Sequence, residues 1–137
     1  MSVPRENARD KAARLGLELV LPADNELFID LDTLEAIDEF KIRFGDFTSI
    51  NTFKHAKVQY TTSANGNTHV IVTLPDEKFT VLERIALQAA LGSDPIREMI
   101  DVDNQRDGYE FVSVLFEKPG TTRRDTPLEV KETTHAD

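Results

Sequence analysis

The chain of 137 residues contains no cysteine. Disulfides, thiolate zinc sites and a cysteine nucleophile are therefore excluded, and this composition fits a cytoplasmic protein. The chain also lacks an apolar run of the roughly 20 residues that a membrane-spanning helix needs. No apolar segment follows the first residues, so we expect no secretory signal. Hydrophobic residues make up 39% of the sequence, which is typical of an ordinary globular domain.

Basic residues are scarce, with 16 Lys and Arg against 25 Asp and Glu and a net charge of −9. Residues 1–17 contain four basic and two acidic residues, whereas residues 18–118 contain nine basic and nineteen acidic ones. Phosphate contacts to nucleic acid need Lys and Arg, so the acidic part of the chain disfavours direct nucleic-acid binding. Its charge suits metal ions or a basic protein partner instead.

The hydrophobic pattern predicts an α+β protein. Period-two alternation predicts strands at 26–31, 52–62, 68–74 and 109–117. Helical spacing predicts helices over 33–44 (ended by Gly45), from about 80 to 91, and, after a cap at Asp94, over 95–100. This order matches the ferredoxin-like or RRM-like βαββαβ plan, a four-stranded antiparallel sheet with its helices on one face. The strand at 26–31 would lie centrally, between the third and fourth strands.

A single α+β domain over residues 21–118 accounts for these elements. The weak apolar stripe in residues 1–20 predicts an N-terminal arm that is partly ordered at best, with a short helix over 5–17. Residues 119–137 are polar and rich in threonine and charge, so we expect a disordered tail.

Two aspartates mark the end of the first strand. Alternation places Leu27, Ile29 and Leu31 on one face of this strand. Phe28 and Asp30 then point to the other face, together with Asp32. Two carboxylates in this spacing can hold a divalent metal. Asp32 also has a structural interpretation, because Asp32-Thr-Leu-Glu35 matches a helix capping box.

The predicted topology brings further polar residues to the same edge of the sheet. His69 begins the third strand and, by alternation, shares the face of Asp30. The hairpin that precedes it carries Ser63 and an Asn65-Gly66 turn signal. The acidic loop before the fourth strand adds three more candidates for a third carboxylate, namely Asp101, Asp103 and Asp107.

This pattern resembles the catalytic core of the archaeo-eukaryotic primase and primase-polymerase superfamily. That family is marked by an hDhD motif at a strand end, a Ser-x-His motif on a hairpin and a third acid near a later strand. Phe28-Ile29-Asp30-Leu31-Asp32 matches the first motif, and Ser63 through His69 matches the second with longer spacing. The segment 83–98 is also similar to small uncharacterised phage proteins.

The resemblance implies a reduced primase-polymerase-like domain in the host cytoplasm, binding a nucleotide with Mg²⁺ or Mn²⁺. It implies metal ligation by Asp30, Asp32 and Asp107, and catalytic roles for Asp30, Asp32 and His69. The residues that would contact the nucleotide are Ser63, Asn65, Gly66, His69 and Arg97. Whether such a domain would still be an enzyme stays open. The alternative is a non-catalytic, acidic, phage-type interaction protein that binds a host or replication protein.

Overall fold

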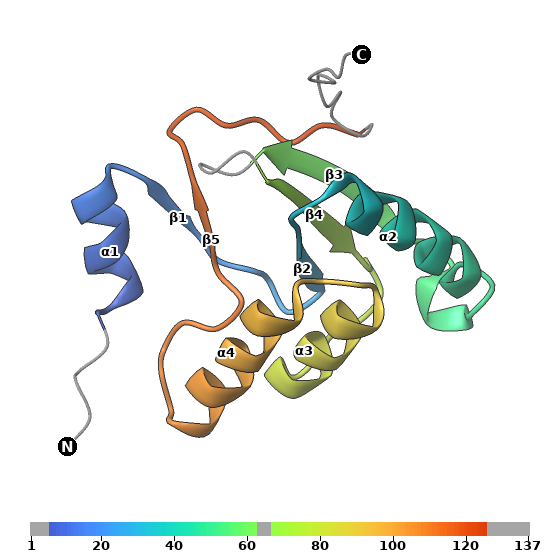
Figure 1. The fold of residues 1–137 in the computed structure, drawn as a ribbon. Coiled ribbons are helices and arrows are strands. Elements are labelled where there is room, and N and C mark those ends of the chain that lie inside the picture. The colour runs from blue at the N-terminus through green and yellow to red at the C-terminus, as the bar shows by residue number, and fades with distance from the viewer. Residues whose placement is uncertain (1–5, 63–66, 126–137) are drawn as a thin grey trace, which may run out of the picture.

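The computed structural model describes residues 6–62 and 67–125 (Figure 1). Its helices are α1 (Ala8–Leu15), α2 (Leu34–Phe47), η1 (Asn51–Phe53, a 3-10 turn), α3 (Val81–Ala90) and α4 (Pro95–Arg106). Its strands are β1 (Glu18–Val20), β2 (Glu26–Leu31), β3 (Lys57–Thr62), β4 (Thr68–Thr73) and β5 (Leu115–Glu117). The α+β class that the sequence predicts is confirmed. None of the helices in these ranges combines the length and apolar character needed to cross a membrane.

The main sheet has three antiparallel strands in the order β2-β4-β3, and the predicted four-stranded sheet is wrong. Leu27, Ile29 and Leu31 face the predicted side and are fully buried. They form the main core with Phe40 of α2 and Leu91, which follows α3. The alternation of β2 and β4 therefore fixed which face carries the helices.

β5 does not join this sheet but pairs antiparallel with β1, a strand that the sequence did not predict. It is also shorter than the predicted strand at 109–117. Ser113 has a φ of 60°, and a residue in this left-handed region cannot continue a β-ladder. The β1–β5 ribbon covers the second face of the main sheet, where Phe28 and Ile71 are fully buried under Leu115 and Val20. The face left open in an RRM-like fold is therefore closed here.

The edge of β2 that the fourth strand would occupy is filled by α3, α4 and the turn between them. The amide of Phe28 donates to the side chain of Gln88, at 2.9 Å, and its carbonyl accepts from Arg97. The amide of Asp30 donates to Ser93 Oγ, and its carbonyl accepts from the amide of Asp94. All four outward-facing backbone groups of Phe28 and Asp30 thus have partners, and this edge has no place for another strand.

Three predicted boundaries change for local reasons. α2 continues past Gly45 to Phe47, whose ring packs edge-on against Phe53 with centroids 5.3 Å apart. Its N-cap is Thr33, which accepts a hydrogen bond from the amide of Ala36, so the predicted cap at Asp32 is wrong. α4 begins at its predicted cap, Asp94, but runs to Arg106 instead of residue 100.

Both chain ends contribute more structure than the sequence predicts. The predicted helix in the arm forms as α1, and β1 follows it and binds β5. In the segment predicted as a tail, Arg124 and Tyr60 exchange backbone hydrogen bonds at the outer edge of β3. Arg123 also pairs with Glu26 at 3.0 Å. The rest of the predicted tail, residues 126–137, lies outside the described residues.

Candidate functional site

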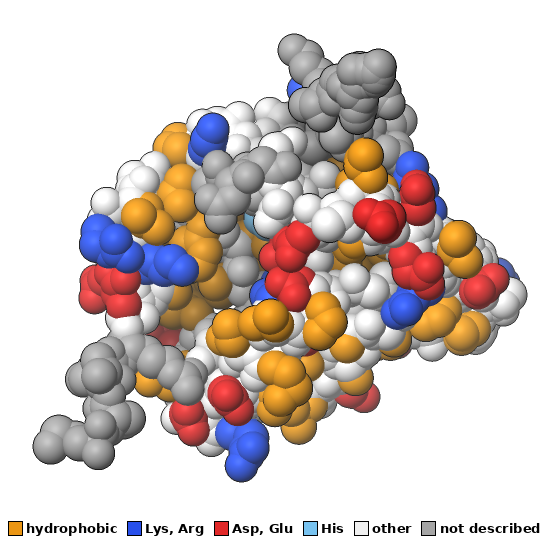
Figure 2. All heavy atoms as spheres, viewed as in Figure 1, with side chains coloured by type: hydrophobic (Ala, Val, Ile, Leu, Met, Phe, Trp, Pro, Cys, Tyr) orange, Lys and Arg blue, Asp and Glu red, His pale blue; other side chains and the backbone are white. Residues whose placement is uncertain are grey.

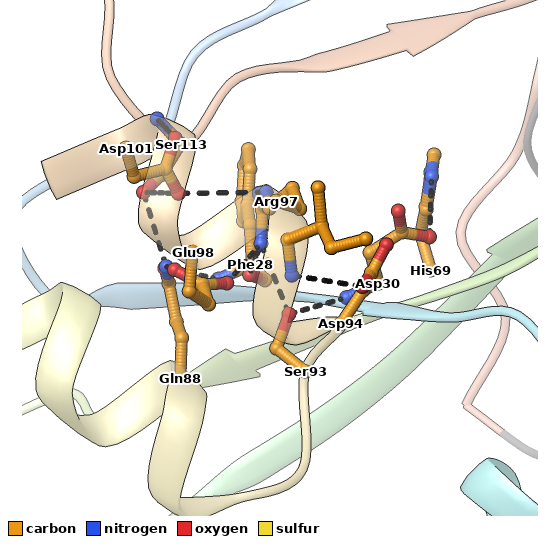
Figure 3. Close-up of polar contacts among 11 residues, drawn as sticks. Phe28, Asp30, His69, Gln88, Ser93, Asp94, Arg97, Glu98, Asp101 and Ser113 are labelled. Atoms are coloured by element: carbon orange, nitrogen blue, oxygen red, sulfur yellow. Dashed lines mark hydrogen bonds and ion pairs between the residues drawn. The ribbon is translucent and has the colours of Figure 1, made fainter. Parts of the chain in front are cut away.

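A row of polar side chains crosses the covered face of the main sheet. Asp30 on β2 is the register partner of His69 on β4, and His69 is the register partner of Thr61 on β3. The backbone groups of Asp30 bond to the α3–α4 turn, so Asp30 and His69 form a non-hydrogen-bonded pair, the type with closer side chains. His69 Nε2 lies 3.6 Å from Asp30 Oδ1 (Figure 3). The predicted convergence of these two residues therefore occurs.

Glu117 on β5 extends the row from the ribbon that covers this face of the sheet, and the sequence analysis missed it. One of its oxygens, Oε1, accepts from Thr61 Oγ1 at 2.8 Å and lies 3.1 Å from His69 Nδ1. The Glu117 side chain is only 6% exposed. An acidic residue at an inward-facing strand position, two after Leu115, was the available signal, because a buried charge requires a partner.

Three carboxylates meet where β2 ends and α4 begins. Ligand atoms of Asp30, Asp32 and Asp94 lie within 4.8 Å of one another. Asp94 caps α4 by accepting from the amide of Ile96. Asp32, released from the capping role, is exposed and accepts from the side chain of Asn67 at 2.9 Å. Asp94 thus takes the third place in the acidic cluster, which comprises Asp30, Asp32 and Asp94.

The environment of this acidic cluster favours a cation. Burial raises the pKa of Asp30, and the charge of Arg97, together with that of His69 when its ring is protonated, opposes this shift. Burial and the charge of Asp30 also raise the pKa of Asp32. Asp30 Oδ1 is buried and has no hydrogen-bond partner in the described part of the chain. An orphaned carboxylate oxygen beside two further acids matches the ligands that Mg²⁺ and Mn²⁺ prefer, so the donor set fits such an ion.

The row opens into a cleft of about 850 Å³ between α1, α4 and residues 111–116. Asp30, His69 and Arg97 contribute to its lining, and Lys11 and Arg14 of α1 contribute from the other side. Figure 2 shows basic side chains over α1 on one side of a hollow and acidic side chains on the other. Basic and acidic groups therefore face the same space, although the chain as a whole is acidic.

Arg97 lies at the cleft, but much of its guanidinium is already engaged. Its Nη1 donates to the carbonyl of Phe28 and to Glu98, the latter at 2.7 Å. Its Nε lies 3.5 Å from Asp101. Its Nη2 is buried without a hydrogen-bond partner among the described residues. The geometry therefore gives Arg97 a structural role at the edge of β2.

A buried polar network extends from Arg97 behind the cleft (Figure 3). The side-chain amide of Gln88 donates to Glu98 and to Ser113, both at 3.0 Å. Both the amide and the hydroxyl of Ser113 donate to Asp101, at 3.0 and 2.8 Å. Burial raises the pKa of Glu98 to about 7, against the opposing charge of Arg97. This network fixes the segment before β5 against α4 and so positions one wall of the cleft.

Comparisons of this chain with protein-family models, curated proteins and solved structures gave no match. The likeness to primase-polymerases therefore stays a prediction.

The remaining predicted site residues do not all come together. Asp107, the predicted third metal ligand, is exposed and caps the C-terminal end of α4. At a rise of about 1.5 Å per residue, it lies roughly 20 Å from Asp94 along the helix. It is absent from the acidic cluster because α4 is longer than predicted and β5 is not beside β2. Ser63, Asn65 and Gly66 lie outside the described residues.

Proposed function

We propose that this protein is a reduced primase-polymerase-like domain that binds a divalent metal ion and a nucleotide in the cleft. The observation that carries this proposal is the acidic cluster of Asp30, Asp32 and Asp94, whose ligand atoms lie within 4.8 Å of one another and whose member Asp30 lines the cleft. These residues would hold Mg²⁺ or Mn²⁺ through oxygen ligands. A metal ion in this place supplies positive charge for the phosphates of the nucleotide.

The size and the charge of the cleft support a nucleotide as the ligand. A cavity of about 850 Å³ falls in the range of small-molecule sites. Lys11 would face phosphate oxygens from the wall of α1, where Arg14 is paired with Glu6 at 2.9 Å, and Arg97 lines the cleft on the side of α4. Phe111 also lines the cleft, and its ring offers an aromatic surface on which the base of the nucleotide would stack. The strongly acidic surroundings disfavour a longer nucleic-acid strand.

The test is the shift in melting temperature caused by Mn²⁺ with a nucleoside triphosphate. A ligand at 100 times its dissociation constant stabilises a fold by about 2.7 kcal/mol, which raises the melting temperature by several degrees. We expect this stabilisation in the wild type and its loss in the Asp30→Asn/Asp32→Asn double variant. Asp107→Asn, which removes an acid outside the cluster, should respond like the wild type. No shift at millimolar Mn²⁺ and nucleotide would contradict the proposal.

A second candidate function rests on three exposed apolar side chains of α4. Ile96, Met99 and Ile100 are 71%, 60% and 53% exposed, and their spacing places them on one side of the helix. Asp94 and Asp103 flank this apolar stripe of α4, so its charge complements a basic amphipathic segment. This surface supports the alternative of an interaction protein whose partner, such as a host or replication protein, presents such a segment.

Peptide binding separates this alternative from nucleotide binding. A lysine-rich amphipathic peptide should move the backbone NMR signals of α4, and added salt should weaken the effect. The Ile96→Asn/Met99→Asn variant should lose the response, and an acidic peptide of equal hydrophobicity should give none. If the lysine-rich peptide leaves the signals of α4 unchanged, this candidate is wrong.

A further inference from the structure

The position of Glu117 determines which nitrogen of a neutral His69 ring carries the hydrogen. Glu117 Oε1 lies 3.1 Å from His69 Nδ1, and a carboxylate oxygen accepts hydrogen bonds. Thr61 Oγ1 donates to the same oxygen at 2.8 Å, which holds the carboxylate in place. Nδ1 of His69 therefore carries the hydrogen. In a neutral imidazole the other nitrogen, Nε2, then presents its lone pair.

The Nε2 atom of His69 faces a carboxylate oxygen of Asp30. Nε2 lies 3.6 Å from Asp30 Oδ1, which is buried and has no hydrogen-bond partner among residues 6–62 and 67–125. When the ring is neutral, these two atoms are both acceptors, and a cation between them stabilises the pair. Metal bonds to imidazole nitrogen and carboxylate oxygen are each about 2.1 Å long, so two of them span up to about 4.2 Å. The observed separation therefore fits one ion bound by both atoms.

The His69 side chain has little freedom to leave this position. It is only 8% exposed, held by Glu117 on one side and lining the cleft on the other. A metal-binding histidine commonly donates its second nitrogen to a carboxylate in this way, which fixes the ring and raises its basicity. The buried His69 ring faces Asp30 of the acidic cluster, and this contact is an observation separate from the grouping of the three carboxylates.

We propose that His69 is itself a metal ligand through Nε2, together with Asp30 Oδ1, and that Glu117 and Thr61 act as positioning residues. This proposal rests on the proposed function, because it assigns a further ligand to the same metal. An imidazole nitrogen suits Mn²⁺, Co²⁺ and Zn²⁺, whereas Mg²⁺ and Ca²⁺ prefer oxygen alone. The site therefore discriminates between divalent ions, with Co²⁺ and Zn²⁺ bound more tightly than Mg²⁺ or Ca²⁺.

The first test is NMR spectroscopy of the ¹⁵N-labelled full-length chain. Without metal, the neutral ring of His69 should show the tautomer with hydrogen on Nδ1. Addition of Zn²⁺ should then shift the ¹⁵N signal of Nε2. Glu117→Leu should mix the two tautomers and weaken Zn²⁺ binding by about 10–100-fold. A wild-type ring with hydrogen on Nε2, or an Nε2 signal that Zn²⁺ does not move, would overturn the inference.

The second test compares the affinities of Co²⁺, Zn²⁺, Mg²⁺ and Ca²⁺ in His69→Gln and in the wild type. We expect His69→Gln to lose at least about 10-fold in affinity for Co²⁺ and Zn²⁺ and to keep its affinity for Mg²⁺. His55→Gln, at an exposed histidine, is the matched control and should bind like the wild type. If His69→Gln binds every ion like the wild type, the ligand role of His69 is refuted and the proposed function stands. If the wild type binds none of the ions, the proposed function fails as well.

Discussion

The replacement Gln88→Leu should destabilise the fold more than any exposed substitution on α3. Gln88 is fully buried, and its side chain accepts from the amide of Phe28 and donates to Glu98 and Ser113. Leucine keeps the helix propensity and most of the volume but leaves the Phe28 amide and one Glu98 oxygen buried without partners. Each such group costs about 1–3 kcal/mol. Burial of the added apolar surface recovers about 1 kcal/mol.

The expected loss in the free energy of unfolding is therefore about 2–4 kcal/mol, a large share of the roughly 5–15 kcal/mol of an ordinary domain. Urea unfolding followed by circular dichroism measures it as a lower midpoint with an unchanged slope. Hydrogen exchange at the Phe28 amide should accelerate by a larger factor than exchange at Val70, in the middle of β4. Gln105→Leu, on α4 and partly exposed, is the control and should change stability by less than about 0.5 kcal/mol. A loss below about 1 kcal/mol for Gln88→Leu would refute the account of the β2 edge.

Three other predictions concern the same framework. Glu98 has a folded-state pKa of about 7, above its ordinary value of 4.5. Between these two pH values the folded state binds more protons than the unfolded state, so the free energy of unfolding should fall as the pH rises from about 4.5 to 7. Glu98→Gln should flatten this part of the curve of unfolding free energy against pH, and an unchanged slope would contradict the assignment. Ser113→Gly and Ser113→Ala lose the same hydroxyl, but only glycine adopts the positive φ of this position without strain. In urea unfolding, the free energy of unfolding of Ser113→Gly should therefore exceed that of Ser113→Ala by about 1 kcal/mol. Thr33→Ala should lower the free energy of unfolding by about 1 kcal/mol through loss of the α2 cap, whereas Asp32→Ala should not destabilise the protein. A lower melting temperature for Asp32→Ala than for Thr33→Ala would instead assign the cap to Asp32.

Much of the candidate site could be predicted because it depends on short-range periodicity. The alternation of Leu27, Ile29 and Leu31 fixed the face of Asp30, and the alternation of Val70 and Val72 fixed the face of His69. The cap at Asp94, with proline after it, is a local signal and was found at the predicted position. The placement of Asp30 beside His69 therefore follows from strand parity together with the pairing of β2 and β4.

The errors arose where distant segments compete for the same backbone groups. Alternation predicted that residues 109–117 form the strand beside β2, but Gln88, Ser93 and Arg97 satisfy that edge instead. A glutamine or arginine on a helix carries no sequence signal that it will bind the edge of a strand. Once that edge was filled, β5 could pair only elsewhere, and it brought Glu117 to His69.

By itself, the sequence determined the α+β class and the core faces of β2 and β4, with Asp30 and His69 on the opposite face, because these follow from periodicity over a few residues. Only the tertiary structure decided that Asp94 completes the acidic cluster, that Asp107 lies at the far end of α4, and that Glu117 holds the His69 ring. The physical reason is that these positions depend on which element satisfies the free edge of β2. Contacts among residues about 60 to 70 positions apart in the chain settle that competition.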